Sequence, residues 1–390
     1  MNNIAFILFN NCKGGVDKIV QTLLDSYPRA DLFCNSDHNF YEEYCKIYSE
    51  RVICTHTITS TLRKIFKFKI GQRYENLVNR YTHGVLQLIL GLTLNWGLRN
   101  KLKKYSHIIF IFGGFPSSDY LFSTYILLPK CAKITVYIHN DNSLNKSILP
   151  KVKFNIYLKI LEKHAPNYIW VSAYSRSTFV SELNTTEKIK DRLFTIYNPC
   201  KINGIKRTRK IINNKFTIGL LGNYEPRKGH LLLIEALTHC KNKHLIEKVV
   251  FYGDGSSKYI NKLKNAIKIN ELEHLVEFHP FSDNNYIYSQ CDFTVIPSIS
   301  YESFGLVQVE SIIFGCPCIV TDSLGPGEIA KLIENPLIFE HLNSLDLAFK
   351  LEDVLGHFQF YLNHIPNSVA LIKKNLSIDT YLFNLEKAIF

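Results

Sequence analysis

Two acidic residues, Glu302 and Glu310, stand eight positions apart on either side of Gly305. Residues 306–313 carry apolar side chains at helical spacing, so a helix is expected to open near Gly305. The N–H groups and positive end of a helix attract anions, which predicts a phosphate site at residues 300–306. Because carboxylates repel phosphates, the two glutamates are expected to bind hydroxyl groups instead. A nucleotide-sugar offers both parts, a diphosphate for the amide groups and sugar hydroxyls for the glutamates.

Two strands are expected to position this helix. Residues 293–296 form an apolar run before the loop, and residues 318–321 form another just after Gly315 and Pro317, which end the helix. A strand, a helix and a second strand in this order build parallel sheets. Ligands of such sheets bind at the carboxyl ends of the strands, where the loop before Gly305 is expected.

The two glutamates could also have a role unrelated to a nucleotide-sugar. They could be solvated helix residues whose spacing is a coincidence. They could instead be the carboxylate pair of a hydrolase, but eight residues of continuous helix rise about 12 Å, whereas glycoside hydrolases hold their carboxylates about 5 to 9.5 Å apart. The loop that precedes Gly305 weakens this geometric objection, so both alternatives stay open at this point.

A basic turn at residues 222–229 has the same kind of setting. It follows the apolar run 216–221 and precedes a helical apolar pattern at 231–237. Arg227 and Lys228 lie in this turn, at the place where a diphosphate would need cations. The alternative is an ordinary solvated basic turn.

The first half of the chain offers two weaker candidates. The apolar run 4–9 leads into a glycine pair that ends at Gly15, and such a turn lets the backbone approach a ligand closely. His139 directly follows the apolar run 133–138, again at the carboxyl end of an expected strand. Taken alone, the glycine pair could be a packing turn and the histidine could be structural.

Two motifs carry a resemblance to a known family. The string from Glu302 to Glu310 has the form E-x-F-G-x-x-x-x-E, and residues 226–229 read Pro-Arg-Lys-Gly. Both resemble retaining GT-B glycosyltransferases of family 4, the glycosyl transferases group 1, of the bacterial surface-polysaccharide type. The resemblance implies an α/β fold of two doubly wound, Rossmann-like domains that face each other across a cleft. It also implies hexosyl transfer with retention at the anomeric carbon.

The resemblance implies roles for individual residues. Glu302 would hold hydroxyls of the transferred sugar, Glu310 the ribose hydroxyls, and Lys228 the diphosphate. His139 would contact the sugar from the first domain, so Glu302, His139 and Lys228 are the catalytic candidates. The donor-binding candidates are Gly15, Gly222, Asn223, Arg227, Lys228, Gly253, Ser303, Phe304, Gly305, Leu306 and Glu310.

Asn223 departs from the family pattern, whereas two further motifs agree with that pattern. Asn223 stands where the family usually has an arginine, so Arg227 is expected to supply the second phosphate cation. Residues 171–175 resemble the family's Val-Ser-x-x-Ser turn, and residues 325–328 resemble its Pro-Glu-Ile region. The expected domains are an acceptor-side Rossmann-like domain (1–200), a basic linker (201–215), a nucleotide-sugar-binding domain (216–377) and a terminal helix (378–390) that returns to the first domain.

The length of 390 residues predicts two domains of ordinary size, and 46% hydrophobic residues can fill their cores. Its ten cysteines include no C-x-x-C pair, so neither a zinc site nor a disulfide framework is expected. The apolar start reads as a strand rather than a signal peptide, which predicts a cytoplasmic protein. No Asp-x-Asp sequence occurs, which agrees with metal-independent stabilisation of the leaving group. No cofactor is expected.

The net charge of +12 is concentrated partly in residues 61–104, which hold ten basic residues and one acid. The apolar stretch 85–98 inside this segment is shorter than the roughly 20 residues that span a bilayer. One interpretation is an interfacial helix that docks on anionic lipid at the inner face of the cytoplasmic membrane. The other is a buried helix with a solvated basic cap. Nucleic acid is disfavoured because no base-reading motif accompanies the basic residues.

The predicted function is therefore transfer of a sugar from a nucleotide-sugar to a glycan or lipid-linked saccharide, in lipopolysaccharide, O-antigen or capsule biosynthesis. Two rivals stay open. A GT-B nucleotide-sugar epimerase would bind the same donor without a glycan acceptor, and an inactive nucleotide-sugar-binding scaffold would bind without turnover.

Overall fold

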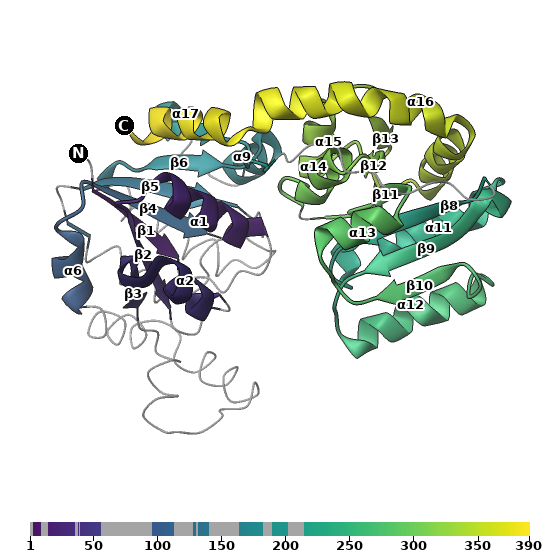
Figure 1. Cartoon of the computed structure of the whole chain (residues 1–390), viewed down its shortest axis with the longest axis horizontal. Coiled ribbons are helices and arrows are strands. Elements are labelled where there is room, and N and C mark those ends of the chain that lie inside the picture. The colour runs from purple at the N-terminus through teal and green to yellow at the C-terminus, as the bar shows by residue number, and fades with distance from the viewer. Residues whose placement is uncertain are drawn as a thin grey trace. The chain divides into compact units, whose positions relative to one another are not determined.

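The computed structural model describes residues 3–8, 15–35, 38, 40–55, 96–112, 128–129, 132–139, 164–181, 189–201, 214–300 and 302–390. These residues form two compact units, each with its own sheet (Figure 1). Unit 1 comprises Met1–Val171, Arg176–Ile196 and Asn384–Phe390, and unit 2 comprises Ser172–Ser175 and Tyr197–Phe383.

Unit 1 is built on a seven-stranded parallel sheet of order β3-β2-β1-β4-β5-β6-β7. Every residue of β1 and β4 is buried, as expected for strands of a parallel sheet that is covered on both faces. The strand predicted at 133–138 is confirmed residue for residue. The strands are β1 (Ile4–Leu8), β2 (Asp31–Asn35), β3 (Val52–Thr55), β4 (His107–Phe112), β5 (Lys133–Ile138), β6 (Asn167–Trp170) and β7 (Leu193–Thr195).

The helices of unit 1 connect these strands. The short helix α6 buries Leu98 and Leu102 in the core and exposes Arg99 and Lys101. This end of the basic segment 61–104 therefore packs as a helix with a solvated basic face, and residues 61–95 lie outside the described part. The helices are α1 (Gly15–Ser26), α2 (Tyr41–Tyr48), α6 (Trp96–Leu102), most of α9 (Ala173–Ser181) and the end of α17 (Ile378–Ile389), with 3-10 turns η1 (Ser49–Arg51) and η3 (Lys190–Arg192).

Unit 2 is built on a six-stranded parallel sheet of order β10-β9-β8-β11-β12-β13. Numbered within the unit, this is the doubly wound order 3-2-1-4-5-6, whose switch point lies between β8 and β11. The strands predicted at 216–221, 293–296 and 318–321 are confirmed. The strands are β8 (Phe216–Leu221), β9 (Ile246–Tyr252), β10 (Val276–His279), β11 (Phe293–Ile296), β12 (Cys318–Thr321) and β13 (Leu337–Phe339).

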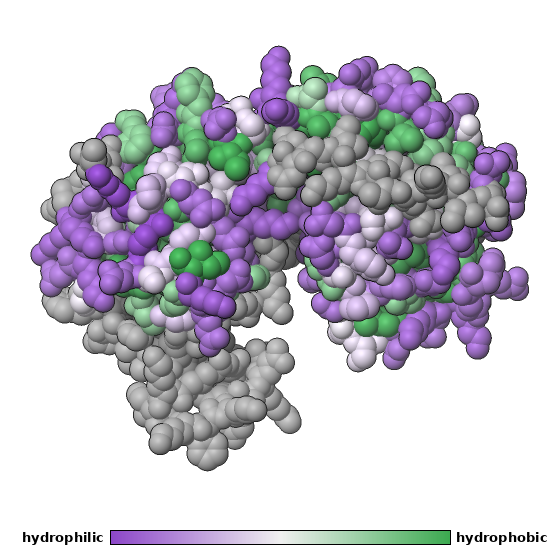
Figure 2. All heavy atoms as spheres, in the orientation of Figure 1, coloured by the Kyte–Doolittle hydropathy of each residue, from purple (hydrophilic) through white to green (hydrophobic). Residues whose placement is uncertain are grey.

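The helices of unit 2 cover this sheet, and hydrophilic residues dominate the visible surface over α12 (Figure 2). The helix predicted to open near Gly305 is confirmed as α14. Among the described helices, none is long and apolar enough to cross a membrane. The helices are α11 (His230–His239), α12 (Ser257–Ile269), α13 (Asn284–Gln290), α14 (Leu306–Ile313), α15 (Leu324–Ala330) and α16 (Ser344–Leu376, kinked at His357), with 3-10 turns η4 (Pro226–Lys228) and η5 (Lys243–Leu245).

Candidate active site

The loops that follow β8 and β11 lie side by side at the carboxyl edge of the unit 2 sheet, because these two strands are neighbours. The backbone N–H of Ile299 donates to the carbonyl of Arg227 at 2.9 Å. Gly229 has a φ of 73°, and a Cβ placed on it would lie 1.7 Å from the carbonyl oxygen of Pro297. The switch point therefore brings together the two loops that carry most of the predicted site residues.

Replacing Gly229 with alanine should destabilise unit 2 by about 2 kcal/mol or more, since the left-handed conformation alone costs roughly 1–2 kcal/mol and the new Cβ also collides with the Pro297 carbonyl. Urea unfolding of the full chain, followed by circular dichroism, measures the change. The control is Gly356→Ala in α16, where a Cβ meets no atom within 4 Å. That control should change the free energy of unfolding by at most about 1 kcal/mol. Equal midpoints for the two variants would contradict the tight packing of the loops.

Lys228 and Glu302 form an ion pair between these loops. Their side chains are 14% and 17% exposed, so water screens the pair only in part. The Arg227 Nη1 atom lies 3.7 Å from the same Glu302 carboxylate, and the Arg227 Nε atom lies 2.7 Å from an oxygen of Glu225. Two cations and two acids thus alternate across the switch point.

Opposing influences act on the Glu302 carboxyl. Burial raises its pKa, but the Lys228 charge, the hydrogen bond from Lys228 and the Arg227 charge outweigh burial and lower the pKa below its usual value. Glu302 is therefore ionised at neutral pH. Because its pKa is lower in the folded chain, its contribution to stability is present above the unfolded pKa of about 4.3 and is lost as the pH falls through the lower folded value.

Gly305 sets the entry to α14. Its φ of 88° is left-handed, which glycine adopts without strain, and it provides no side-chain cap for the first N–H groups of the helix. A Cβ at this position would lie 2.9 Å from Cγ of Pro326. Ser303 and Phe304 are buried just before Gly305, and Leu306 is half-buried. The helix start is thus held in place by backbone packing, with its positive end at the same edge of the sheet as Lys228.

Glu310 lies in the second turn of α14, beside a tyrosine that the sequence did not single out. The Tyr288 hydroxyl lies 3.4 Å from the Glu310 carboxylate and 3.2 Å from the carbonyl of Val307. Tyr288 itself is buried, and its ring stacks on Phe314 at 4.9 Å. The pairing depends on how α13 packs beside α14, so no local pattern in the sequence signals it.

The remaining unit 2 candidates surround the basic turn. The Gly222 N–H donates to the Tyr252 carbonyl at 2.9 Å, which joins the turns after β8 and β9. Gly253 directly follows β9 in that second turn, and its own N–H donates to the carbonyl of His279. Asn223 is exposed, and its amide nitrogen lies 3.5 Å from an oxygen of Glu225. Asn223 therefore faces the carboxylate that Arg227 also contacts.

Gly15 and His139 belong to unit 1, whereas every other predicted site residue belongs to unit 2. Gly15 is the first residue of α1. His139 follows β5 and is buried, and its ring centroid lies 4.1 Å from that of Tyr137. Its backbone N–H donates to the Phe112 carbonyl at 2.8 Å.

His230 adds a buried titratable group directly after Lys228 and Gly229. Its ring packs 5.5 Å from Tyr224 and 5.1 Å from Phe251. Burial, and then the Lys228 charge, lower the pKa of His230 from 6.5 to about 4. The histidine is therefore neutral at physiological pH. The only sequence signal for this site is its position next to the basic turn.

Lowering the pH from 6.5 to 4 should destabilise unit 2, because the unfolded chain then binds a proton at His230 that the folded chain excludes. The shift corresponds to about 3 kcal/mol of unfolding free energy in total. Urea unfolding at several pH values tests this. His230→Phe keeps an aromatic ring and should flatten the pH dependence. The same change at the exposed His274 is the matched control. An unchanged slope in His230→Phe would contradict the assignment.

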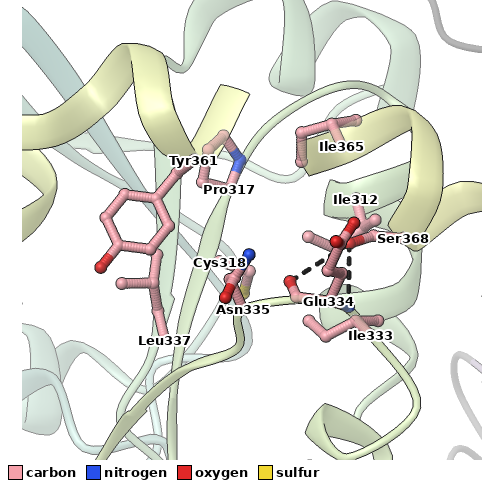
Figure 3. Close-up of a pocket in the computed structure, with 10 residues that line it drawn as sticks. All are labelled: Ile312, Pro317, Cys318, Ile333, Glu334, Asn335, Leu337, Tyr361, Ile365 and Ser368. Atoms are coloured by element: carbon pink, nitrogen blue, oxygen red, sulfur yellow. Dashed lines mark hydrogen bonds between the residues drawn. The ribbon is translucent and has the colours of Figure 1, made fainter. Parts of the chain in front are cut away.

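A small cavity lies at the opposite edge of the unit 2 sheet (Figure 3). Its volume of about 20 Å³ has room for one water molecule. Its lining includes Pro317 and Asn335, which precede β12 and β13 at their amino ends. The cavity also includes Glu334, whose N–H donates to the Ser368 hydroxyl at 3.2 Å. It is too small for a nucleotide, and it lies at the amino ends of the strands, whereas the loops after β8 and β11 lie at the carboxyl ends.

Sequence comparisons place the second half of the chain with known glycosyltransferases. Residues 202–358 match the family model described as glycosyl transferases group 1. The O-antigen biosynthesis glycosyltransferase WclY of Escherichia coli is 32% identical over 169 residues, which cover 42% of this chain and 43% of WclY. The N-acetylgalactosamine-N,N'-diacetylbacillosaminyl-diphospho-undecaprenol 4-alpha-N-acetylgalactosaminyltransferase of Campylobacter jejuni is 23% identical over 350 residues, 86% of each chain.

Comparison with solved structures gives the fold of the whole chain. The crystal structure of Anabaena HepE in complex with UDP superposes with a TM-score of 0.76 at 18% identity, over 99% of this chain and 98% of HepE. This likeness confirms the predicted GT-B type of α/β fold. Over residues 202–358, the chain is similar to the glycosyl transferases group 1 family.

Proposed function

We propose that the chain is a retaining glycosyltransferase that moves a hexose from a nucleotide-sugar to a glycan or lipid-linked saccharide. The observation that carries this proposal is the Lys228–Glu302 ion pair at the switch point of unit 2, beside the start of α14. A cation, a helix N-terminus and a carboxylate at one sheet edge suit a ligand that joins a diphosphate to a hydroxyl-rich sugar. The family match and the UDP bound by HepE support the same ligand class.

Each residue of the site has a part in this proposal. Lys228 and the first amide groups of α14 stabilise the negative charge that develops on the departing diphosphate. Arg227 supplies the second cation in place of the arginine that Asn223 replaces. Glu302 accepts hydrogen bonds from hydroxyls of the transferred sugar. Glu310, which lies beside the Tyr288 hydroxyl, accepts them from the ribose hydroxyls.

The transfer step exchanges one bond for another at the anomeric carbon. The bond from this carbon to the diphosphate oxygen breaks, and its electron pair leaves with the nucleoside diphosphate. A bond from the acceptor hydroxyl oxygen forms on the same face of the sugar, and the hydroxyl proton passes to the departing diphosphate oxygen. For His139 and Gly15 of unit 1, the roles that the family resemblance implies are kept as part of the proposal. No side chain is assigned as a nucleophile, and no metal ion takes part.

The acceptor is proposed from the relatives. WclY is named for O-antigen biosynthesis, and the Campylobacter enzyme is named for a diphospho-undecaprenol acceptor. A lipid-linked saccharide of lipopolysaccharide, O-antigen or capsule assembly is therefore the proposed acceptor class. The enzyme would work in the cytoplasm, and residues 61–104 would contact the anionic inner face of the membrane. Flotation with anionic and neutral vesicles tests that contact, and equal binding to both would contradict it.

A transfer assay tests the proposed reaction. The full chain is incubated with UDP-, GDP-, ADP- and TDP-sugars, with and without an undecaprenyl-diphosphate saccharide, and released nucleoside diphosphate is measured in the presence of EDTA. We expect release that depends on the acceptor, with an anomeric configuration in the product that matches the donor. An altered sugar on an intact nucleotide without any acceptor would identify an epimerase. Donor binding without turnover would identify a scaffold protein.

A further inference from the structure

Glu328 holds the start of a helix from another part of the chain. Its two carboxylate oxygens accept hydrogen bonds from the N–H groups of Ala173 and Tyr174 at 2.8 and 2.7 Å. These are the first two N–H groups of α9, where a negative charge is stabilised by the helix dipole and by charge-assisted hydrogen bonds. Residues Ser172–Ser175 fold with unit 2, although the chain on either side of them folds with unit 1.

The turn at residues 172–175, which Glu328 holds, is hydrogen-bonded to a loop at residues 302–305. We call residues 302–305 the donor loop. The Ser172 hydroxyl is fully buried and donates to the carbonyl of Ser303 at 2.5 Å. The N–H of Ser175 donates to the Ser172 hydroxyl at 3.0 Å and so fixes the position of that oxygen. Ser303 directly follows Glu302 in the chain, so this contact acts on the backbone that carries the Glu302 carboxylate.

A direct contact from α15 supports the donor loop from a second side. The Gly325 N–H donates to the Glu302 carbonyl at 2.8 Å. A Cβ on Gly325 would lie 2.3 Å from the carbonyl carbon and oxygen of Ser303, so the two backbones are in close contact. Two consecutive carbonyl groups of the donor loop are therefore held, one by α15 itself and one by the turn that Glu328 fixes.

We infer that Glu328 is a positioning residue for sugar transfer, which holds the donor loop in place through the Ser172–Ser175 turn. The inference rests on the proposed function for its effect on turnover. It assigns a task to two motifs that lie 155 residues apart in the chain, the Val-Ser-x-x-Ser turn and the region that ends in Glu328. Glu328 acts through the backbone, because both of its oxygens bind N–H groups of α9.

A carboxylate is the group that this task requires. Two oxygens in one plane satisfy two adjacent N–H groups at once, whereas a glutamine amide offers one acceptor oxygen and turns an NH2 group toward the second donor. Glu328→Gln therefore keeps the shape of the side chain and breaks one of the two hydrogen bonds. Ser172→Ala removes the next link, and Ser172→Thr restores the hydroxyl.

The test measures turnover and hydrogen exchange in Glu328→Gln, Ser172→Ala, Ser172→Thr and the double variant Glu328→Gln/Ser172→Ala. We expect each of the first two to lower kcat about 10- to 100-fold and to raise exchange of the amides at residues 302–308 about tenfold. The double variant should be no worse than the stronger single variant, because both changes act on the same Ser303 carbonyl. Ser172→Thr should recover most of the turnover.

The matched control is Glu352→Gln in the same unit, since Glu352 also accepts a backbone N–H, that of Lys241 at 2.6 Å, away from the donor loop. Because a glutamine oxygen can still accept this single N–H, the change should leave both kcat and the amide exchange at residues 302–308 unchanged. Wild-type exchange at residues 302–308 in Glu328→Gln, or fully additive losses in the double variant, would overturn the inference. Absence of transfer by the wild-type chain would instead overturn the proposed function, and the exchange measurement would still decide the positioning role.

Discussion

Replacing Lys228 with alanine should lower kcat/KM for the nucleotide-sugar by about 100- to 1,000-fold, the usual loss when one preorganised donor to a developing anion is removed. Two effects add in this variant. The diphosphate loses a direct cation. In addition, Glu302, which is 17% exposed, loses its nearer cation and keeps only Arg227, whose Nη1 atom lies 3.7 Å from the Glu302 carboxylate. Both effects place more negative charge at the departing diphosphate. Initial rates at varied donor concentration measure the loss.

A lysine with an ion pair outside the site provides the control for this experiment. Lys248 pairs with Glu277 at 2.6 Å, and its side chain is 47% exposed. Lys248→Ala should leave kcat/KM within about twofold of wild type, because exposed pairs contribute little. If Lys248→Ala and Lys228→Ala lowered the rate equally, the effect would come from general charge and the assignment of Lys228 would be wrong.

Glu302→Gln should separate donor affinity from turnover. Turnover should fall about 100-fold, because the carboxylate that accepts the sugar hydroxyls is lost. Affinity for the free nucleoside diphosphate should rise, by about tenfold, because a diphosphate no longer competes with Glu302 for the Lys228 ammonium. Calorimetric titration with the diphosphate and steady-state kinetics with the sugar conjugate measure the two quantities.

A change at Glu310, the second acid of the motif, is the control for Glu302→Gln. It shows whether affinity rises because Glu302 no longer competes with the diphosphate, or only because the net charge becomes more positive. Glu310 lies beside the Tyr288 hydroxyl, and it is proposed to bind ribose. Glu310→Gln should therefore weaken binding of the nucleoside diphosphate, although it changes the net charge as Glu302→Gln does. A rise in affinity in both variants, or a fall in both, would contradict competition between Glu302 and the diphosphate.

The elements of unit 2 could be predicted because each is a local pattern. The runs 216–221, 293–296 and 318–321 are apolar and end at glycine, proline or polar residues, so strand type and bounds follow from a few neighbouring side chains. Gly305 marked the start of α14 for the same reason, since few other residues tolerate a φ of 88°.

The pairing of side chains could not be predicted in the same way. Lys228 and Glu302 lie 74 residues apart and meet because β8 and β11 are neighbours at the switch point. The motif at 226–229 predicts a contact with the diphosphate, and the motif at 302–310 predicts contacts with hydroxyl groups. Neither motif therefore indicates that Lys228 and Glu302 pair with each other. The contacts of Tyr288 and Glu328 escape sequence reasoning for the same reason, because they depend on the packing of α13 and α15.

The most direct test of the central claim is calorimetric titration of the full chain with UDP, GDP, ADP and TDP, repeated on Lys228→Ala. The account predicts that one of these binds the wild-type chain at one site and that the variant loses at least about tenfold in affinity, as expected when a charged hydrogen bond is removed. If none binds, or if the variant binds as tightly as the wild type, then the switch point of unit 2 does not hold a donor diphosphate.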